Sequence, residues 1–275
     1  LRQQQSKPGN SGNLKRVDVT PTMTISTEIR SFLNRLLLPA MIAGFVCLTS
    51  PTGAAGLSLQ GPSGFIQVPS HKTVDAKGIE LAMHNRLYQV PGTNTEGYLT
   101  HMAFAFSPFR DLELGLQKAV DSRNSALDPD PTLNFKVRLP SIGEGEFSEV
   151  AFGAVFDTNP NNYHTMYFSI GGFGLGWNFG GNPGSGMANF GRYNRGKKEP
   201  ESLCLLIGAE FPGRKPGERG YKSQYLLDYN GDVVSAGWRY SSHRGFWLDI
   251  AVHSPSSYDQ FYDYRPLIVG LGANF

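Results

Sequence analysis

Apolar and polar residues alternate along most of the chain after residue 56, and this two-residue period predicts β-strands rather than helices. The last segment shows the pattern most clearly. One of its faces carries Leu267, Val269, Leu271, Ala273 and Phe275, and the other carries Ile268, Gly270, Gly272 and Asn274. Similar segments recur with lengths of about 9–11 residues, which suit a tilted strand that crosses a membrane.

The alternating segments divide the chain into about 12 predicted strands, an even number, as a single-chain bacterial barrel requires. We therefore predict an all-β fold, a single closed antiparallel transmembrane β-barrel formed by residues 56–275. The predicted strands lie near 78–88, 97–106, 111–120, 132–140, 147–157, 163–171, 173–180, 202–211, 221–229, 232–241, 245–253 and 265–275.

Alternation alone fits two opposite structures. A soluble sandwich turns its apolar face inward, whereas an outer-membrane barrel turns that face toward lipid and its polar face toward the lumen. Segment length, aromatic residues near segment ends and the aromatic C-terminus favour the barrel. In this interpretation Leu267, Val269, Leu271, Ala273 and Phe275 form an assembly signal for the barrel-assembly machinery. A secreted β-sandwich adhesin is the alternative.

The N-terminal region has the layout of an export signal. Arg30 and Arg35 precede a short apolar run at 36–48, and small residues follow at 52–56. We expect a signal peptide over residues 23–55, cleaved after Ala55. Residues 1–22 are polar and precede a plausible start methionine, so we expect an unstructured tail or a start-site artefact.

Placing Phe275 at the periplasmic rim makes most connections on that side short and most outer connections long, as expected for such barrels. Two connections fit this rule poorly: 212–220 is long for a periplasmic turn, and Asn230-Gly231 is short for an outer loop. Residues 181–201 are compatible with a surface loop, a plug or a hairpin through 188–193, and we expect the loop.

Composition supports export to a membrane rather than binding to nucleic acid. Aromatic residues make up 12% of the chain and charged residues only 17%, below the ~25% of typical soluble domains. Without residues 1–55 the chain carries slightly more acidic than basic groups, and no basic block suited to nucleic acid is present.

The predicted lumen face carries charges of both signs. They are expected to pair across the lumen and hold it partly closed; the alternative is a narrow pore whose ion preference they set. The predicted lumen-lining residues are Glu80, His84, Glu113, Lys136, Arg138, Glu149, Asp157, Lys222, Asp228, Arg239, Asp249 and His253, with Glu210 on the same face.

Nothing in the sequence predicts an enzyme, a cofactor or a metal site. His253 and Asp249 share a face, but four residues along a strand separate them by about 13 Å. His164 and His243 lie near strand ends without an obvious partner, and the common hydrolase, metal and phosphate-loop motifs are absent. We predict a non-enzymatic protein, with an outer-membrane hydrolase using a rim site as the alternative.

Several phrases resemble the YjbH-like outer-membrane proteins, which are associated with exopolysaccharide production. These phrases are GPSGFIQVPSHKTVDAKGIELAMH at 61–84 and YLLDYNGDVVSAGWRYSSHRGFWLDIAV at 225–252, with shorter echoes at 114–117, 152–157 and 174–177. The resemblance implies an outer-membrane β-barrel associated with exopolysaccharide production. With the export signal, the alternation and the C-terminal strand, we expect a small channel or an outer-membrane component of an envelope or exopolysaccharide export system in a Gram-negative bacterium. The resemblance also implies polysaccharide or export-system proteins as partners beside outer-membrane lipid.

Overall fold

The computed structural model describes residues 56–89, 96–122, 130–140, 149–184, 186–213, 222–256 and 263–275. The expected tail at 1–22 and the expected signal peptide at 23–55 lie outside these ranges. Within them, no helix is long and apolar enough to cross a membrane.

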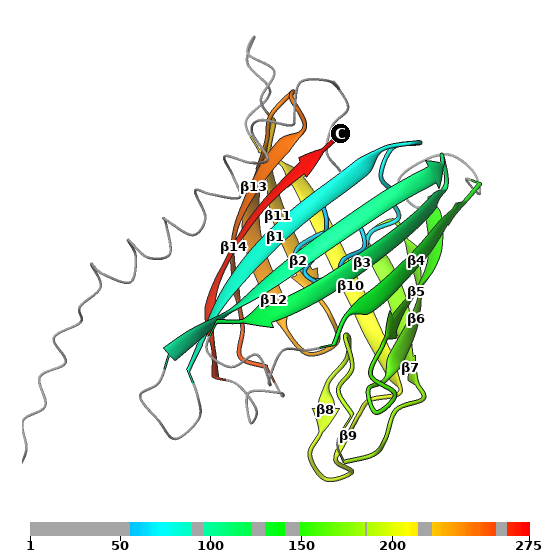
Figure 1. Ribbon diagram of the computed structural model, residues 1–275, viewed down its shortest axis with the longest axis vertical. Helices are drawn as coiled ribbons and strands as arrows, with labels where there is room; N and C mark the ends of the chain where they lie inside the picture. The colour runs from blue at the N-terminus through cyan, green and yellow to red at the C-terminus, as the bar shows by residue number, and fades with distance from the viewer. Residues whose placement is uncertain are drawn as a thin grey trace, which may run out of the picture. The chain divides into compact units, whose positions relative to one another are not determined.

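Twelve antiparallel strands close into one barrel, which confirms the predicted fold class (Figure 1). Around the barrel the order is β1-β14-β13-β12-β11-β10-β7-β6-β5-β4-β3-β2. The strands are β1 (Ile79–Gln89), β2 (Glu96–Phe109), β3 (Leu112–Asp121), β4 (Thr132–Leu139), β5 (Val150–Asp157), β6 (His164–Ile170), β7 (Phe173–Phe179), β10 (Leu203–Pro212), β11 (Lys222–Tyr229), β12 (Val234–Ser241), β13 (Phe246–His253) and β14 (Asp263–Asn274).

The first and last strands pair with each other, and this pairing closes the barrel. Leu81 on β1 lies opposite Ala273 on β14, and the backbones of Ile79 and Phe275 exchange hydrogen bonds of 2.8 and 3.1 Å. Closure leaves no free sheet edge among these strands, so their backbone groups are paired without help from solvent. A β-sandwich adhesin is therefore the wrong architecture.

The apolar faces of the strands point out of the barrel. On β13, Ile250 and Val252 are 44% and 51% exposed, whereas Asp249 and Ala251, which alternate with them, are both only 2% exposed. The same alternation runs through the other strands, with large apolar side chains outside and most charged side chains buried inside. This arrangement is the inverse of a soluble barrel and is typical of outer-membrane barrels.

The connections follow the predicted sidedness without a strand slip. The turns β2–β3, β6–β7 and β12–β13 lie at the same end of the barrel as Phe275. The turn at 230–233 joins β11 to β12 at the opposite end, so this outer connection is simply short. Its tightness comes from Asn230, whose side-chain oxygen accepts hydrogen bonds from the amides of Asp232 and Val233.

Residues 180–202 are more ordered than the predicted surface loop. They contain a small hairpin of β8 (Tyr193–Asn194) and β9 (Glu199–Pro200), placed later than the hairpin considered at 188–193. Before this hairpin, the Phe190 side chain turns into the barrel and is 1% exposed. The segment thus combines a hairpin at the barrel mouth with one apolar side chain that enters the lumen.

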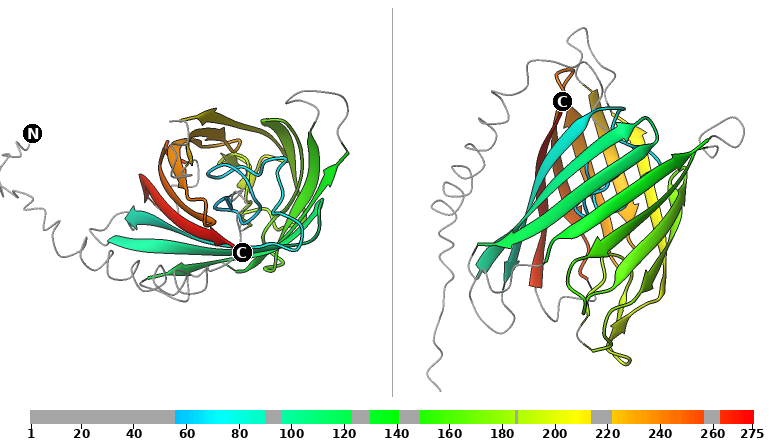
Figure 2. Two further views of the ribbon diagram at one scale, coloured as in Figure 1. Left: turned by 90° about the horizontal axis from the view of Figure 1, so that it is seen from above. Right: turned by 45° about the vertical axis from the view of Figure 1, so that its right-hand side comes forward.

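Residues 56–78, called the plug segment below, lie inside the barrel (Figure 2). The segment folds on itself through two isolated bridges, Leu57 with Ser63 and Gly64 with Pro69. Its apolar residues Leu57, Leu59 and Ile66 are at most 1% exposed. The alternation pattern predicts no strand in this segment within the barrel at 56–275, and it does not predict that the segment fills the lumen.

Outward-facing leucines provide a test of the inverted pattern. Leu116 on β3 is 44% exposed, and replacing it with arginine should lower the free energy of unfolding by about 2–4 kcal/mol if this face meets hydrocarbon. The measurement is urea unfolding of the protein refolded in lipid bilayers.

Phe109→Arg is the matched control, because Phe109 is 70% exposed at the last residue of β2. The cost of arginine falls to about 0–1 kcal/mol near the membrane interface. Equal, small effects at both positions would show that the outer face of the barrel does not contact lipid.

Candidate functional site: a lumen closed by the plug segment

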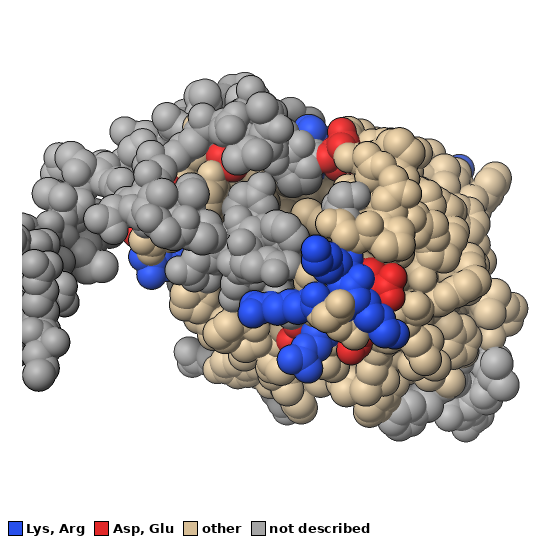
Figure 3. All heavy atoms as spheres, turned by 90° about the horizontal axis from the view of Figure 1, so that it is seen from below, with Lys and Arg blue, Asp and Glu red and all other residues tan. Residues whose placement is uncertain are grey.

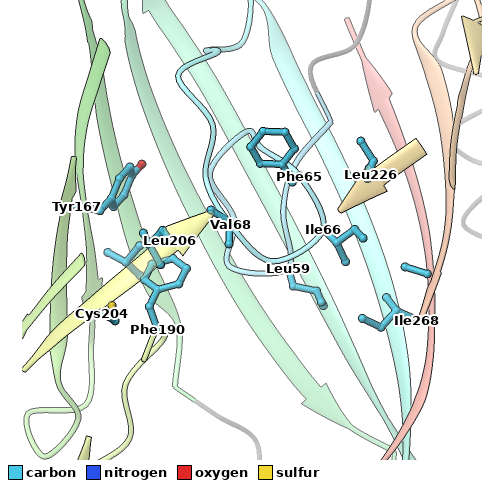
Figure 4. Close-up of a cluster of buried hydrophobic side chains, with 12 residues drawn as sticks. Leu59, Phe65, Ile66, Val68, Tyr167, Phe190, Cys204, Leu206, Leu226 and Ile268 are labelled. Carbon is cyan, nitrogen blue, oxygen red and sulfur yellow. The ribbon is translucent and has the colours of Figure 1, made fainter. Parts of the chain in front are cut away.

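An apolar cluster anchors the plug segment in the lumen (Figure 4). Phe65 lies against the bare backbone of Gly208 on β10, where any side chain would overlap the ring. The members of the cluster are Leu59, Phe65, Ile66, Val68, Val155, Tyr167, Phe190, Cys204, Leu206, Leu226, Ala251 and Ile268. Phe190 joins it from the hairpin region and meets Tyr167 edge-on, with ring centroids 6.3 Å apart. The two inserted segments thus share one apolar core inside a polar barrel.

The first polar anchor is the buried pair of Glu113 on β3 and Lys136 on β4. The carboxylate of Glu113 accepts hydrogen bonds of 2.9 Å from the backbone amides of Ser63 and Val74. The Lys136 ammonium donates to the carbonyl oxygen of Ser63 at 2.8 Å and also to that of Lys72. Because both charges are 1% exposed, the plug supplies the hydrogen bonds that water would otherwise provide.

Asp228 on β11 forms the second polar anchor. One of its carboxylate oxygens, Oδ2, accepts from the three successive backbone amides of Ile66, Gln67 and Val68, at 2.9, 2.6 and 3.2 Å. Successive amides that converge on one oxygen make an anion-binding concavity in the plug backbone. This contact fixes the tight bend that carries Phe65 and Ile66 into the apolar cluster.

The third anchor is the buried pair of Arg239 on β12 and Asp249 on β13. The guanidinium binds the carboxylate through two hydrogen bonds, Nε to Oδ1 at 2.8 Å and Nη2 to Oδ2 at 2.7 Å. Its remaining donors reach the plug carbonyl oxygens of Gly64 at 3.0 Å and Phe65 at 3.1 Å. Adjacent plug residues are therefore held by a cation at their carbonyls and by an anion at the following amides.

Half-buried ion pairs complete the contacts of the plug at its exit. Lys72 Nζ lies 2.8 Å from Glu210 Oε2, and His71 Nε2 lies 2.5 Å from Glu149 Oε2. Ion pairs with this degree of exposure add little stability. The three buried anchors and the apolar cluster therefore hold the segment.

The predicted lumen residues separate into two groups. Those at most 6% exposed inside the barrel are Glu80, His84, Glu113, Lys136, Asp228, Arg239, Asp249 and His253. Those at or near strand ends are Arg138, Glu149, Asp157 and Lys222. In this second group, Arg138 pairs with Asp111 at 2.8 Å and Lys222 with Glu210 at 3.6 Å.

Two buried ion pairs among the described residues form between neighbouring strands, not across the lumen as expected. Lys136 and Glu113 are direct neighbours on β4 and β3, and Arg239 and Asp249 are direct neighbours on β12 and β13. Both pairs then reach inward to the plug backbone. Both pairs could have been predicted from the register of the two hairpins, because that register places the opposite charges next to each other.

The predicted assembly residues lie on the barrel wall. Leu267 is 41% exposed, Val269, Leu271 and Phe275 are half-buried, and Ala273 is 2% exposed. The alternate residue Ile268 points inward and joins the lumen cluster. The assembly role of the outward residues stays a prediction.

His253 and His164, two of the histidines considered for a rim hydrolase site, make other contacts in the described part of the chain. His253 places Nδ1 2.8 Å from the carbonyl oxygen of Ser254 and Nε2 2.9 Å from that of Arg265, with Arg86 at 3.2 Å. His164 lies between the rings of Phe156 and Phe179, tilted toward the first and edge-on to the second, with ring centroids 5.8 and 5.6 Å apart. Among the described residues, no group of three or more His, Cys, Asp or Glu side chains could hold a metal ion.

Comparison with known proteins adds little to this picture. No family model matches the chain, and no curated protein matches its sequence. Similar solved structures include the N-terminal β-barrel domain of Pseudomonas aeruginosa OprF, at 11% identity, covering 73% of this chain and 98% of that one. Its TM-score of 0.25 is too low to support an argument.

The Asp228 anchor makes a direct prediction. Asp228→Asn keeps the shape of the side chain but removes the charge that three amides share. We therefore expect the free energy of unfolding to fall by about 1–3 kcal/mol. Urea unfolding measures this change, and limited proteolysis of the plug should accelerate with it.

Asp111→Asn is the matched control, because Asp111 is 52% exposed in a rim ion pair. Its loss should cost less than about 1 kcal/mol. A plug that stays equally protected in both variants would mean that Asp228 does not hold it.

Proposed function

We propose that this protein is an outer-membrane β-barrel of a Gram-negative bacterium whose lumen is closed at rest by its own plug segment. The inverted burial pattern carries the proposal. A continuous apolar surface around a barrel with buried charges is stable where lipid, rather than water, surrounds it.

The proposed role is non-enzymatic and belongs to the cell envelope. The YjbH-like resemblance supports a component of an exopolysaccharide export system, with polysaccharide or export-system proteins as partners. The plug qualifies the channel role: conduction requires the segment to move, because its apolar cluster and three anchors occupy the lumen. We propose a gated channel or an outer-membrane export component rather than a constantly open pore.

Membrane fractionation followed by gel mobility tests the location. The protein should be recovered with the outer membrane and should migrate differently before and after boiling in detergent, as a closed barrel does. A soluble protein with unchanged mobility would contradict the proposal.

Planar-bilayer conductance tests the plug. The intact barrel should be silent or show rare openings, whereas a variant in which a short Gly-Ser linker replaces residues 57–74 should conduct steadily. The refolded barrel of each variant must first show the same heat-dependent mobility. Steady conductance of the intact protein would show that the plug does not close the lumen.

The hairpin of β8 and β9 points to an anionic partner at the outer surface. Arg192, Arg195, Lys197 and Lys198 are exposed there, and among the described residues no ion pair neutralises them. Figure 3 shows Lys and Arg side chains gathered at this end of the barrel, with a smaller number of Asp and Glu side chains beside them. We propose that this patch binds acidic groups of the polysaccharide.

Neutralising Arg195, Lys197 and Lys198 together as glutamines should weaken binding of an acidic polysaccharide by at least about tenfold at low salt. The matched control neutralises Lys77, Arg110 and Arg244, which are exposed at the opposite end. Surface plasmon resonance with purified alginate as the probe measures both. Equal affinities in the two variants would remove the patch from the binding surface.

A further inference from the structure

The buried carboxylate of Glu80 in the lumen forms no ion pair among the described residues. Glu80 on β1 is 0% exposed. Its Oε1 accepts a hydrogen bond of 2.7 Å from Trp247 Nε1, but Oε2 has no hydrogen-bond partner. A buried polar atom without a partner carries a large desolvation cost.

The neighbouring cation is shared with a second carboxylate. Arg239 lies near Glu80 and over the ring of Trp247, with 5.0 Å to the ring centroid. Its guanidinium is already bound at two points to Asp249. Glu80 and Asp249 therefore share one guanidinium, with His84 Nε2 3.9 Å from Asp249 Oδ2, and the next buried pair, Lys136 with Glu113, is balanced in itself.

The backbone of Gly56, the first residue of the plug segment, lies beside the Glu80 carboxylate. Gly56 has a φ of +75°, which favours glycine, and a side chain at this position would overlap the Arg239 guanidinium. The backbone of Gly56 is therefore held directly between Glu80 and Arg239.

We propose that proteolytic cleavage between Ala55 and Gly56 creates an α-ammonium group that pairs with Glu80 inside the lumen. A protease adds water across the peptide bond, so Ala55 leaves as a carboxylate and the freed Gly56 amine takes up a proton. The new cation balances Glu80 and supplies donors for Oε2. Leader removal then locks the plug in place.

This inference rests on the proposed function, because it requires an exported barrel with a leader. A single cleavage before Gly56 accounts for both the glycine at position 56 and the burial of Glu80. Small residues at Ala54 and Ala55 suit cleavage at this bond.

A double-mutant cycle on refolded barrels tests the pair. One form begins at Gly56 and the other at Thr52, which moves the α-amine four residues away; each is made with Glu80 and with Glu80→Gln. In the Gly56 form, Glu80→Gln should lower the folding equilibrium constant by at least about tenfold. In the Thr52 form the same change should have little effect or should stabilise the barrel.

Glu201→Gln serves as the matched control, because Glu201 is exposed beside the hairpin; it should be neutral in both forms. An equal effect of Glu80→Gln in both forms would overturn the proposed pair. Loss of heat-dependent mobility in the unmutated barrels would instead count against the proposed function.

Two further measurements use the native protein and do not depend on whether the variants fold. Intact mass of the protein purified from membranes should correspond to a chain that begins at Gly56, and another start would overturn the cleavage site. The α-amine should resist an acylating reagent in the folded barrel and react after unfolding. Rapid acylation of the folded barrel would place the amine outside the lumen.

Discussion

The structure depends on one constraint: charged groups inside a closed barrel must be satisfied by protein. Lipid on the outside selects apolar side chains for the outer face, so the alternating strand leaves its polar residues facing inward. Buried charges are tolerated only when paired and hydrogen-bonded. Lys136 with Glu113 and Arg239 with Asp249 meet the first condition, and the plug segment meets the second by offering its own amides and carbonyls.

The plug is consequently an integral part of the fold. Its irregular backbone would be costly in hydrocarbon, and it is tolerated here because it is enclosed by protein. Phe65 and Ile66 add an apolar centre that the strands alone do not form, since Tyr167, Leu206 and Leu226 approach it from different strands. To open the lumen, the plug segment must give up both its polar anchors and its apolar contacts. A partner that binds the segment more strongly outside the barrel would supply the driving force.

Much of the barrel could be predicted from the sequence because strand alternation is a local signal. The segment from Leu267 to Phe275 shows complete alternation, and the structure confirms a closed barrel of 12 strands. The plug could not be recognised in this way, since residues 61–70 carry Gly, Pro and Ser without any period. The partners of Asp228 and Lys136 were missed for the same reason: they are backbone atoms of a segment more than 60 residues away.

Hydrogen exchange at the plug amides tests the central claim most directly. If Asp228 and the lumen hold the segment, the amides of Ile66, Gln67 and Val68 should exchange as slowly as those of the neighbouring strands when the barrel is kept in detergent micelles or bilayers. Exchange at the rate of an unstructured chain, with the strands still protected, would show that the lumen is not closed by this segment.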